Sequence, residues 1–171
     1  MRSAFGFTLG VSVILQVTVA ASASDAQAAD PHACTYFQAS DLLKITGRKD
    51  VLGEGPQASK PGETAAGTTE CDFLSISMTV TSNMTPAWFA RDKTMLEKSP
   101  DRWKVESVSG LGDEAYYMWD PRPGSNRNVG IVYRAGGKRV SVGELAESSD
   151  SIASAKPMLM QIAKLALPKL K

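Results

Sequence analysis

The sequence predicts an α+β fold, a single domain with a mainly antiparallel sheet of about five strands packed with helices in the order α-β-α-β-β-β-β-α. Three observations predict it. Apolar and polar side chains alternate from Cys71 to Thr81, which is typical of a half-buried strand. The pair Gly136-Gly137 separates two apolar-rich segments and favours a two-residue hairpin. Near the end of the chain, apolar residues recur at helical spacing from about Asp150 to Leu167.

The first half of the domain is predicted to hold two helices separated by a loop and a strand. The first helix is expected to begin at Ser40 or Asp41, either of which can cap it, and to end at Gly47. Residues 53–70 are rich in Gly, Pro, Ala and Thr, which indicates a flexible surface loop. Thr85-Pro86 should start the second helix, and Ser99-Pro100 should end it. The apolar stripe of the second helix is expected to be Trp88, Phe89, Met95 and Leu96.

The strands are predicted from alternation and from the turns between them. In the strand from Cys71 to Thr81, the inward side chains are expected to be Leu74, Ile76, Met78 and Val80. Four further strands are predicted near residues 103–108, 114–119, 128–135 and 138–145. The last helix contains Pro157, so we expect either a kink there or a separate first turn.

The N-terminus has the features of an export signal. Arg2 precedes an uncharged, apolar run from Ala4 to Ala20, and two Ala-x-Ala patterns follow, the second at residues 26–28. We therefore expect residues 1–28 to be a signal peptide and residues 29–171 to form the mature domain. The alternative is an N-terminal membrane anchor, which the shortness of the run disfavours. The predicted location is the periplasm or the extracellular space.

Cys34 and Cys71 are the only cysteines. In an oxidising compartment they are expected to form a structural disulfide. The alternative is a redox pair or a metal-binding thiol, which the absence of a C-x-x-C spacing disfavours.

Composition and charge exclude several classes. The chain is 43% apolar and carries 19 basic against 18 acidic groups, so it is neither a disordered tail nor a general polyanion binder. His32 is the single histidine, which argues against a histidine-dependent hydrolase and against a multi-histidine zinc site. No metal and no cofactor are expected. An enzyme using carboxylate or tyrosine chemistry stays open as the alternative, with Asp113, Tyr116 or Asp120 as candidates.

One stretch is basic without local compensation, because no acidic residue occurs between Asp120 and Glu144. On a hairpin, its cations and the neighbouring aromatic residues would form a cationic edge suited to an anionic polymer, a glycan or an acidic protein surface. The alternative is a solvated sheet edge that discourages edge pairing. The candidate binding residues are Trp119, Arg122, Arg127, Tyr133, Arg134, Lys138 and Arg139.

Several segments together form a layout: Cys34-Thr-Tyr-Phe at the mature start, Cys71 at a strand, and Gly110-Leu-Gly-Asp-Glu-Ala-Tyr-Tyr117 entering another strand. With the glycine hairpin and the last helix, this layout resembles a broad group of small secreted or lipid-anchored bacterial proteins of unknown function. The likeness covers roughly residues 33–168. It implies a compact α/β sandwich and an envelope location, and it implies no activity.

The expected function is therefore that of an exported, non-enzymatic binding or interaction protein of the cell envelope. Its partner would be an envelope protein or an anionic or glycan ligand. We expect no specific nucleic-acid binding, no transmembrane span after processing, and a monomer. A purely structural envelope component is a third possibility.

Overall fold

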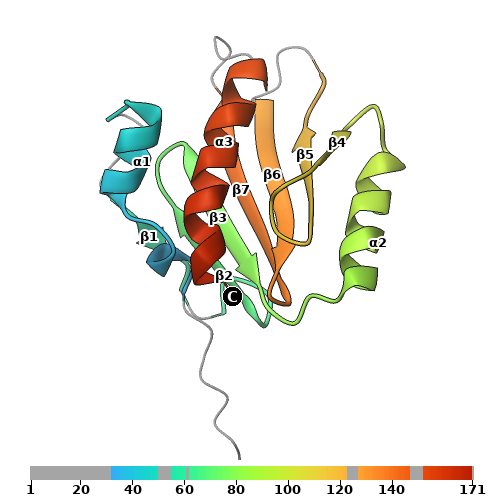
Figure 1. Ribbon diagram of the computed structural model, residues 1–171, viewed down its shortest axis with the longest axis horizontal. Coiled ribbons are helices and arrows are strands. Elements are labelled where there is room, and N and C mark those ends of the chain that lie inside the picture. The colour runs from blue at the N-terminus through green and yellow to red at the C-terminus, as the bar shows by residue number, and fades with distance from the viewer. Residues whose placement is uncertain (1–31, 50–54, 61, 123–126, 147–151, 171) are drawn as a thin grey trace, which may run out of the picture.

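The computed structural model describes residues 32–49, 55–60, 62–122, 127–146 and 152–170 (Figure 1). The predicted signal peptide therefore lies outside the described residues. The elements in chain order are η1 (Ala33–Thr35), α1 (Ala39–Thr46), β1 (Gln57–Ala58), β2 (Thr68–Asp72), β3 (Ile76–Thr81), α2 (Pro86–Glu97), β4 (Lys104–Val108), β5 (Glu114–Trp119), β6 (Arg127–Ala135), β7 (Lys138–Ala146), α3 (Ile152–Ala166) and η3 (Leu167–Lys169).

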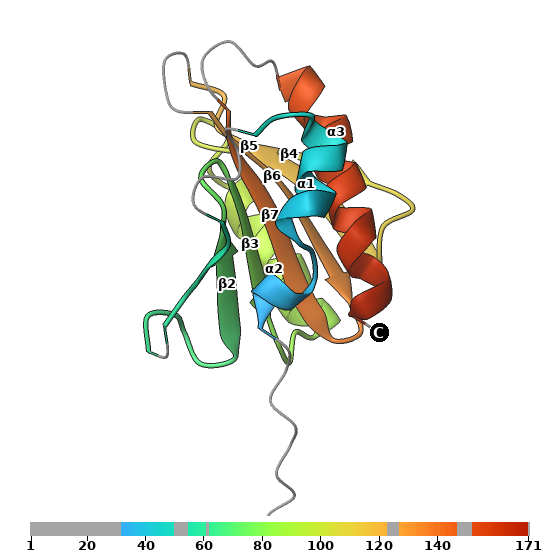
Figure 2. The same cartoon turned by 90° about the vertical axis from the view of Figure 1, so that its left-hand side faces the viewer.

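The strands form one antiparallel sheet of seven strands in the order β1-β2-β3-β7-β6-β5-β4. Helices α1 and α3 stand together on one side of this sheet, as the side view in Figure 2 shows. Helix α2 lies at the end of the sheet that carries β4 and β5 (Figure 1). The α+β class and the antiparallel sheet are confirmed, and the expected number of about five strands is wrong.

One of the two additional strands comes from the segment around Cys71. The sequence predicted one strand from Cys71 to Thr81, but the chain turns back at Leu74-Ser75, where the backbones of Phe73 and Ile76 exchange hydrogen bonds of 2.7 and 3.2 Å. Leu74 is consequently 69% exposed, whereas Phe73 and Ile76 are both buried. Because the buried residues Phe73 and Ile76 are three positions apart rather than two, the alternation of buried and exposed side chains shifts by one residue here, which marks a hairpin.

The range 53–70, predicted to be a loop, contains β1 and the start of β2. These short, polar strands lie at the edge of the sheet, where β1 pairs only through Gln57 and Ala58. An edge strand needs few apolar side chains, so it shows little hydrophobic alternation. The flexibility of this range stays a prediction.

The helices differ from the predictions mainly in their caps and exposed faces. The N-cap of α1 is Gln38 rather than Ser40 or Asp41, and the Asp41 carboxylate accepts a hydrogen bond from the Gln38 N–H (3.2 Å). Thr85 caps α2 as predicted, and α3 is a continuous helix with Pro157 inside it. The predicted stripe of α2 is wrong in part, because Trp88 and Met95 are 60% and 61% exposed. None of the helices in the described ranges is long and apolar enough to span a membrane.

Two apolar clusters hold these layers together. The larger one joins η1, α1 and α3 to one face of the sheet, and the predicted disulfide between Cys34 and Cys71 is confirmed within it. The smaller cluster joins α2 to the other face through Phe89, Tyr116 and Val132. On that second face, α2 covers β4, β5 and the Val132 end of β6, and no described helix lies over the part formed by β2, β3, most of β7 and Gly130 of β6, with Met118 of β5 at its border. We call this uncovered part the open face.

Candidate functional site

The residues predicted to form a basic and aromatic edge do not share one surface. Tyr133 is fully buried, and its hydroxyl donates a hydrogen bond to the Ala163 carbonyl of α3 (3.2 Å). Trp119 also lies on the α3 side, where the Lys156 ammonium is 4.3 Å from its ring centre. Arg134 follows Tyr133 along β6 and therefore points to the opposite face. The aromatic platforms and the arginines are thus separated by the sheet.

The cations of this stretch are compensated by acidic residues from other elements. Arg139 Nε lies 2.8 Å from Asp92 of α2, and Arg134 pairs with Asp113 (3.0 Å) and Glu114 (3.6 Å). Arg122 Nε lies 2.9 Å from Asp120. The side chains of Arg134 and Arg139 are only 14% and 20% exposed. Lys138 also makes an interaction, and the side chain of Arg127 lies outside the described residues. An uncompensated cationic edge is therefore not formed by Arg122, Arg134 and Arg139, and partner binding by the seven residues stays a prediction.

Reversing the charge of Arg139 is consequently expected to destabilise the fold. In Arg139→Glu the new carboxylate would lie beside the Asp92 carboxylate, which already accepts a hydrogen bond from the Tyr116 hydroxyl (3.0 Å). We expect the free energy of unfolding to fall by about 2 kcal/mol, measured by urea denaturation. Arg139→Gln, which removes the charge without adding repulsion, should cost less. Equal free energies of unfolding for Arg139→Glu and wild type would show that the ion pair does not stabilise the fold.

The three candidates for carboxylate and tyrosine catalysis, Asp113, Tyr116 and Asp120, do not converge in the fold. Burial raises the pKa of Tyr116, the nearby Asp92 carboxylate raises it further, and the Tyr116 ring is fully buried beneath α2. Asp113 and Asp120 flank β5 at its two ends. They are seven residues apart on an extended strand, which separates them by about 23 Å. These three side chains cannot act on one bond.

A cavity of about 410 Å³ between α2 and the β4-β5 turn contains a lysine and a serine in contact. Lys93 Nζ donates a hydrogen bond to Ser107 Oγ (2.7 Å), and the Glu97 carboxylate lies 3.7 Å from the same ammonium. A serine nucleophile needs a neighbour that accepts its proton. Here the lysine donates to the serine, so this contact does not form a nucleophile and base pair.

The open face carries a groove built on a row of residues that cross five strands. The register places Asp72 opposite Ser77, Ser77 opposite Gly143, Gly143 opposite Gly130, and Gly130 opposite Met118. Because strand residues alternate between faces, this row lies on the side away from the Cys71 disulfide. Ser77, Gly143 and Gly130 of this row therefore form the floor of the groove, and Asp72 and Met118 lie at its two ends.

Two glycines at the centre of the row create the depression. A Cβ atom added to Gly143 would lie 3.4 Å from Ser77 Oγ, and one added to Gly130 would lie 3.5 Å from Met118 Cγ. Since neither glycine has a side chain, the sheet surface is lower here than on either side. The groove has a volume of about 430 Å³. It is lined by Glu70, Asp72, Phe73, Leu74, Ser75, Ile76, Ser77, Met118, Asn128, Val129, Gly130, Ser141, Gly143 and Glu144.

Two carboxylates of β2 form one wall of the groove. Glu70 and Asp72 are two residues apart on one strand and therefore point the same way. Burial raises the pKa of Glu70, and the neighbouring Asp72 raises it further; burial also raises the pKa of Asp72. Within the described ranges neither carboxylate forms an ion pair. By contrast, most described carboxylates are paired: Asp41, Asp92, Glu97, Glu106, Asp113, Glu114, Asp120 and Glu144.

Hydroxyl groups next to the glycines also lack partners. Thr79 of β3 and Ser141 of β7 are register partners in the row that begins at Glu70, and Ser77 lies in the glycine row. None of these three hydroxyls makes a hydrogen bond with another described residue. The Oγ of Ser75, at the end of the groove, is buried and has no partner among the described residues. The groove, together with Thr79 beside it, thus offers unused donors and acceptors in addition to negative charge.

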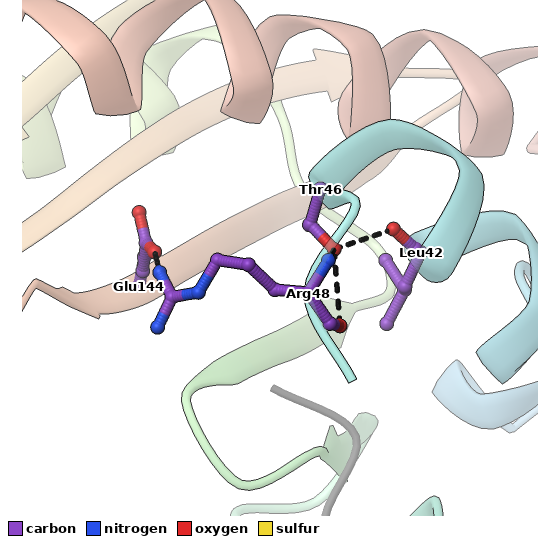
Figure 3. A network of polar contacts seen from close by, with 4 residues as sticks. All are labelled: Leu42, Thr46, Arg48 and Glu144. Carbon is purple, nitrogen blue, oxygen red and sulfur yellow. Dashed lines mark hydrogen bonds and ion pairs between the residues drawn. The ribbon is translucent and has the colours of Figure 1, made fainter. Parts of the chain in front are cut away.

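The network of Arg48 and Glu144 supports the other side of β7 (Figure 3). Arg48 Nη1 lies 3.3 Å from the Glu144 carboxylate, whose side chain is only 2% exposed. Thr46 Oγ1 accepts a hydrogen bond from the Arg48 N–H (3.1 Å) and donates one to the Leu42 carbonyl (2.9 Å). This network joins the end of α1 to β7. Glu144 alternates with Gly143, so its carboxylate belongs to the opposite face from Glu70 and Asp72.

Sequence reasoning missed the groove, although one signal could have found it. Gly130 and Gly143 interrupt two predicted strands, and a glycine inside a strand often marks a place of close approach. Glu70 and Asp72 gave no signal, because the sequence predicts Glu70 in a loop and Asp72 at the start of a different strand.

No family model, no curated protein and no solved structure matches this chain. Among the described residues, no group of three or more His, Cys, Asp or Glu side chains could hold a metal ion.

Proposed function

We propose that this protein is an exported, non-enzymatic binding domain of the cell envelope, and that it binds a positively charged ligand in the groove of the open face. The apolar N-terminal run with its Ala-x-Ala patterns supports export. The Cys34–Cys71 disulfide is compatible with an oxidising compartment. The basic stretch suggested an anionic ligand, whereas the ligand proposed for this groove is a cation.

The observation that carries this proposal is the pair of uncompensated carboxylates above a glycine floor. Glu70 and Asp72 repel each other and are partly desolvated, and both effects raise the pKa of Glu70. A bound ammonium or guanidinium would remove the repulsion and replace the lost hydration with charge-assisted hydrogen bonds. The groove between them and Met118 leaves room for the rest of the ligand.

The proposal is tested by isothermal titration calorimetry of the mature chain with spermidine, a small polyamine. We expect Glu70→Gln/Asp72→Asn to bind spermidine at least tenfold more weakly than wild type, because two charge-assisted contacts are lost. Glu63→Gln/Asp101→Asn is the matched control, since it removes two exposed carboxylates outside the groove. Equal affinity of the groove variant and the control variant would refute the site.

The same groove variant should not lose stability. An acid whose pKa is raised on folding binds its proton more tightly in the folded state, so its contribution to stability is largest at low pH and is lost as the pH rises through the folded pKa. Glu70 and Asp72 are both of this type. At neutral pH the neutral isosteres should therefore leave the free energy of unfolding unchanged or slightly raise it. Binding of spermidine by wild type should strengthen as the pH rises through the raised pKa values.

A further inference from the structure

We infer that the ligand of the groove is a glycan that carries free amino groups. This inference rests on the proposed function and adds the chemical class of the ligand. Amino sugars combine an ammonium with several hydroxyls and with a flat, partly apolar ring. The open face offers carboxylates for the ammonium, hydroxyls for the sugar hydroxyls, and space over the glycines for the ring.

The carboxylates and the floor account for the polar parts of such a ligand. Glu70 and Asp72 would pair with the ammonium groups. Ser77, Thr79 and Ser141 have hydroxyls with no partner in the described chain, and each can both donate and accept. Sugar hydroxyls also donate and accept, so they match this floor more closely than an aliphatic polyamine does. The glycine row leaves space for a ring to approach the backbone.

A cationic peptide fits these features less well. A peptide that binds a sheet usually does so by adding a strand at an edge. The floor strands β3 and β7 are interior strands whose backbones already pair on both sides. The floor therefore offers hydroxyl side chains rather than free backbone groups, which favours a ligand that itself bears hydroxyls.

The test is calorimetry at about pH 6 with three probes: a tetramer of β-1,4-linked glucosamine, its fully N-acetylated counterpart, and spermidine. We expect the glucosamine tetramer to bind at least tenfold more tightly than either of the other probes. Thr79→Val/Ser141→Ala should weaken tetramer binding about five- to tenfold and leave spermidine binding unchanged. Far-ultraviolet circular dichroism of every variant confirms folding.

The outcomes separate this inference from the proposed function. Spermidine binding that depends on Glu70 and Asp72, without tighter binding of the tetramer, would overturn the glycan and leave the cation site in place. Equal binding of the acetylated and free tetramers would overturn the role of the amino groups. Absence of binding by all three probes would overturn both proposals.

Discussion

Replacing both cysteines, in Cys34→Ala/Cys71→Ala, is expected to lower the free energy of unfolding by about 4 kcal/mol. The disulfide joins residues 37 positions apart, and closing a chain segment of that length restricts the unfolded state. In the folded state it fixes η1 to β2 within the larger apolar cluster, next to the stacked rings of Phe37 and Phe73. Urea denaturation of the variant and of the oxidised wild type measures the difference.

Reduction of the wild type provides the control for this variant. If chain restriction is the cause, the reduced wild type and the double alanine variant should have similar free energies of unfolding. A loss below about 1 kcal/mol in both would show that contacts of η1, and not the covalent bond, hold this edge. If the variant loses about 4 kcal/mol and the reduced wild type does not, the loss comes from a packing defect around Cys71, which is fully buried.

The sequence predicted best the elements whose information is local. Strand β5 coincides with the predicted range 114–119, and β6 and β7 lie within one residue of their predicted ends. Alternation within a strand and a two-glycine hairpin are both read from neighbouring residues. The pairing of Cys34 with Cys71 was also predicted, because two cysteines allow a single intramolecular bridge.

The groove could not be predicted in the same way, because it depends on pairing between distant segments. Ser77 meets Gly143 because β3 pairs with β7, and these strands are separated in sequence by α2, β4, β5 and β6. Nothing near Ser77 in the sequence specifies that partner. The same reason explains why the basic stretch looks uncompensated in the sequence, since Arg139 pairs with Asp92, 47 residues away. Local charge patterns do not show compensation across the sheet.

Gly112→Ala is expected to destabilise the protein by about 3 kcal/mol, whereas Gly110→Ala, two residues earlier, should cost about 1 kcal/mol. Both glycines have positive φ angles, +60° and +77°, so an alanine at either position adopts a strained backbone. A Cβ at Gly110 would meet nothing within 4 Å, but one at Gly112 would lie 2.3 Å from the Arg134 carbonyl oxygen. Urea denaturation of the two variants isolates the steric contribution, since both variants share the backbone strain.

The position of Gly112 also connects stability to the groove. The Arg134 carbonyl that the new Cβ would displace accepts a hydrogen bond from the Asp113 N–H (2.8 Å), which sets β5 against β6. That register places Met118 opposite Gly130 and so builds one wall of the groove. Folded Gly112→Ala should therefore bind spermidine more weakly than Gly110→Ala at equal folded concentration. Equal stability and equal binding of the two variants would mean that the Arg134 carbonyl moves aside without disturbing β5.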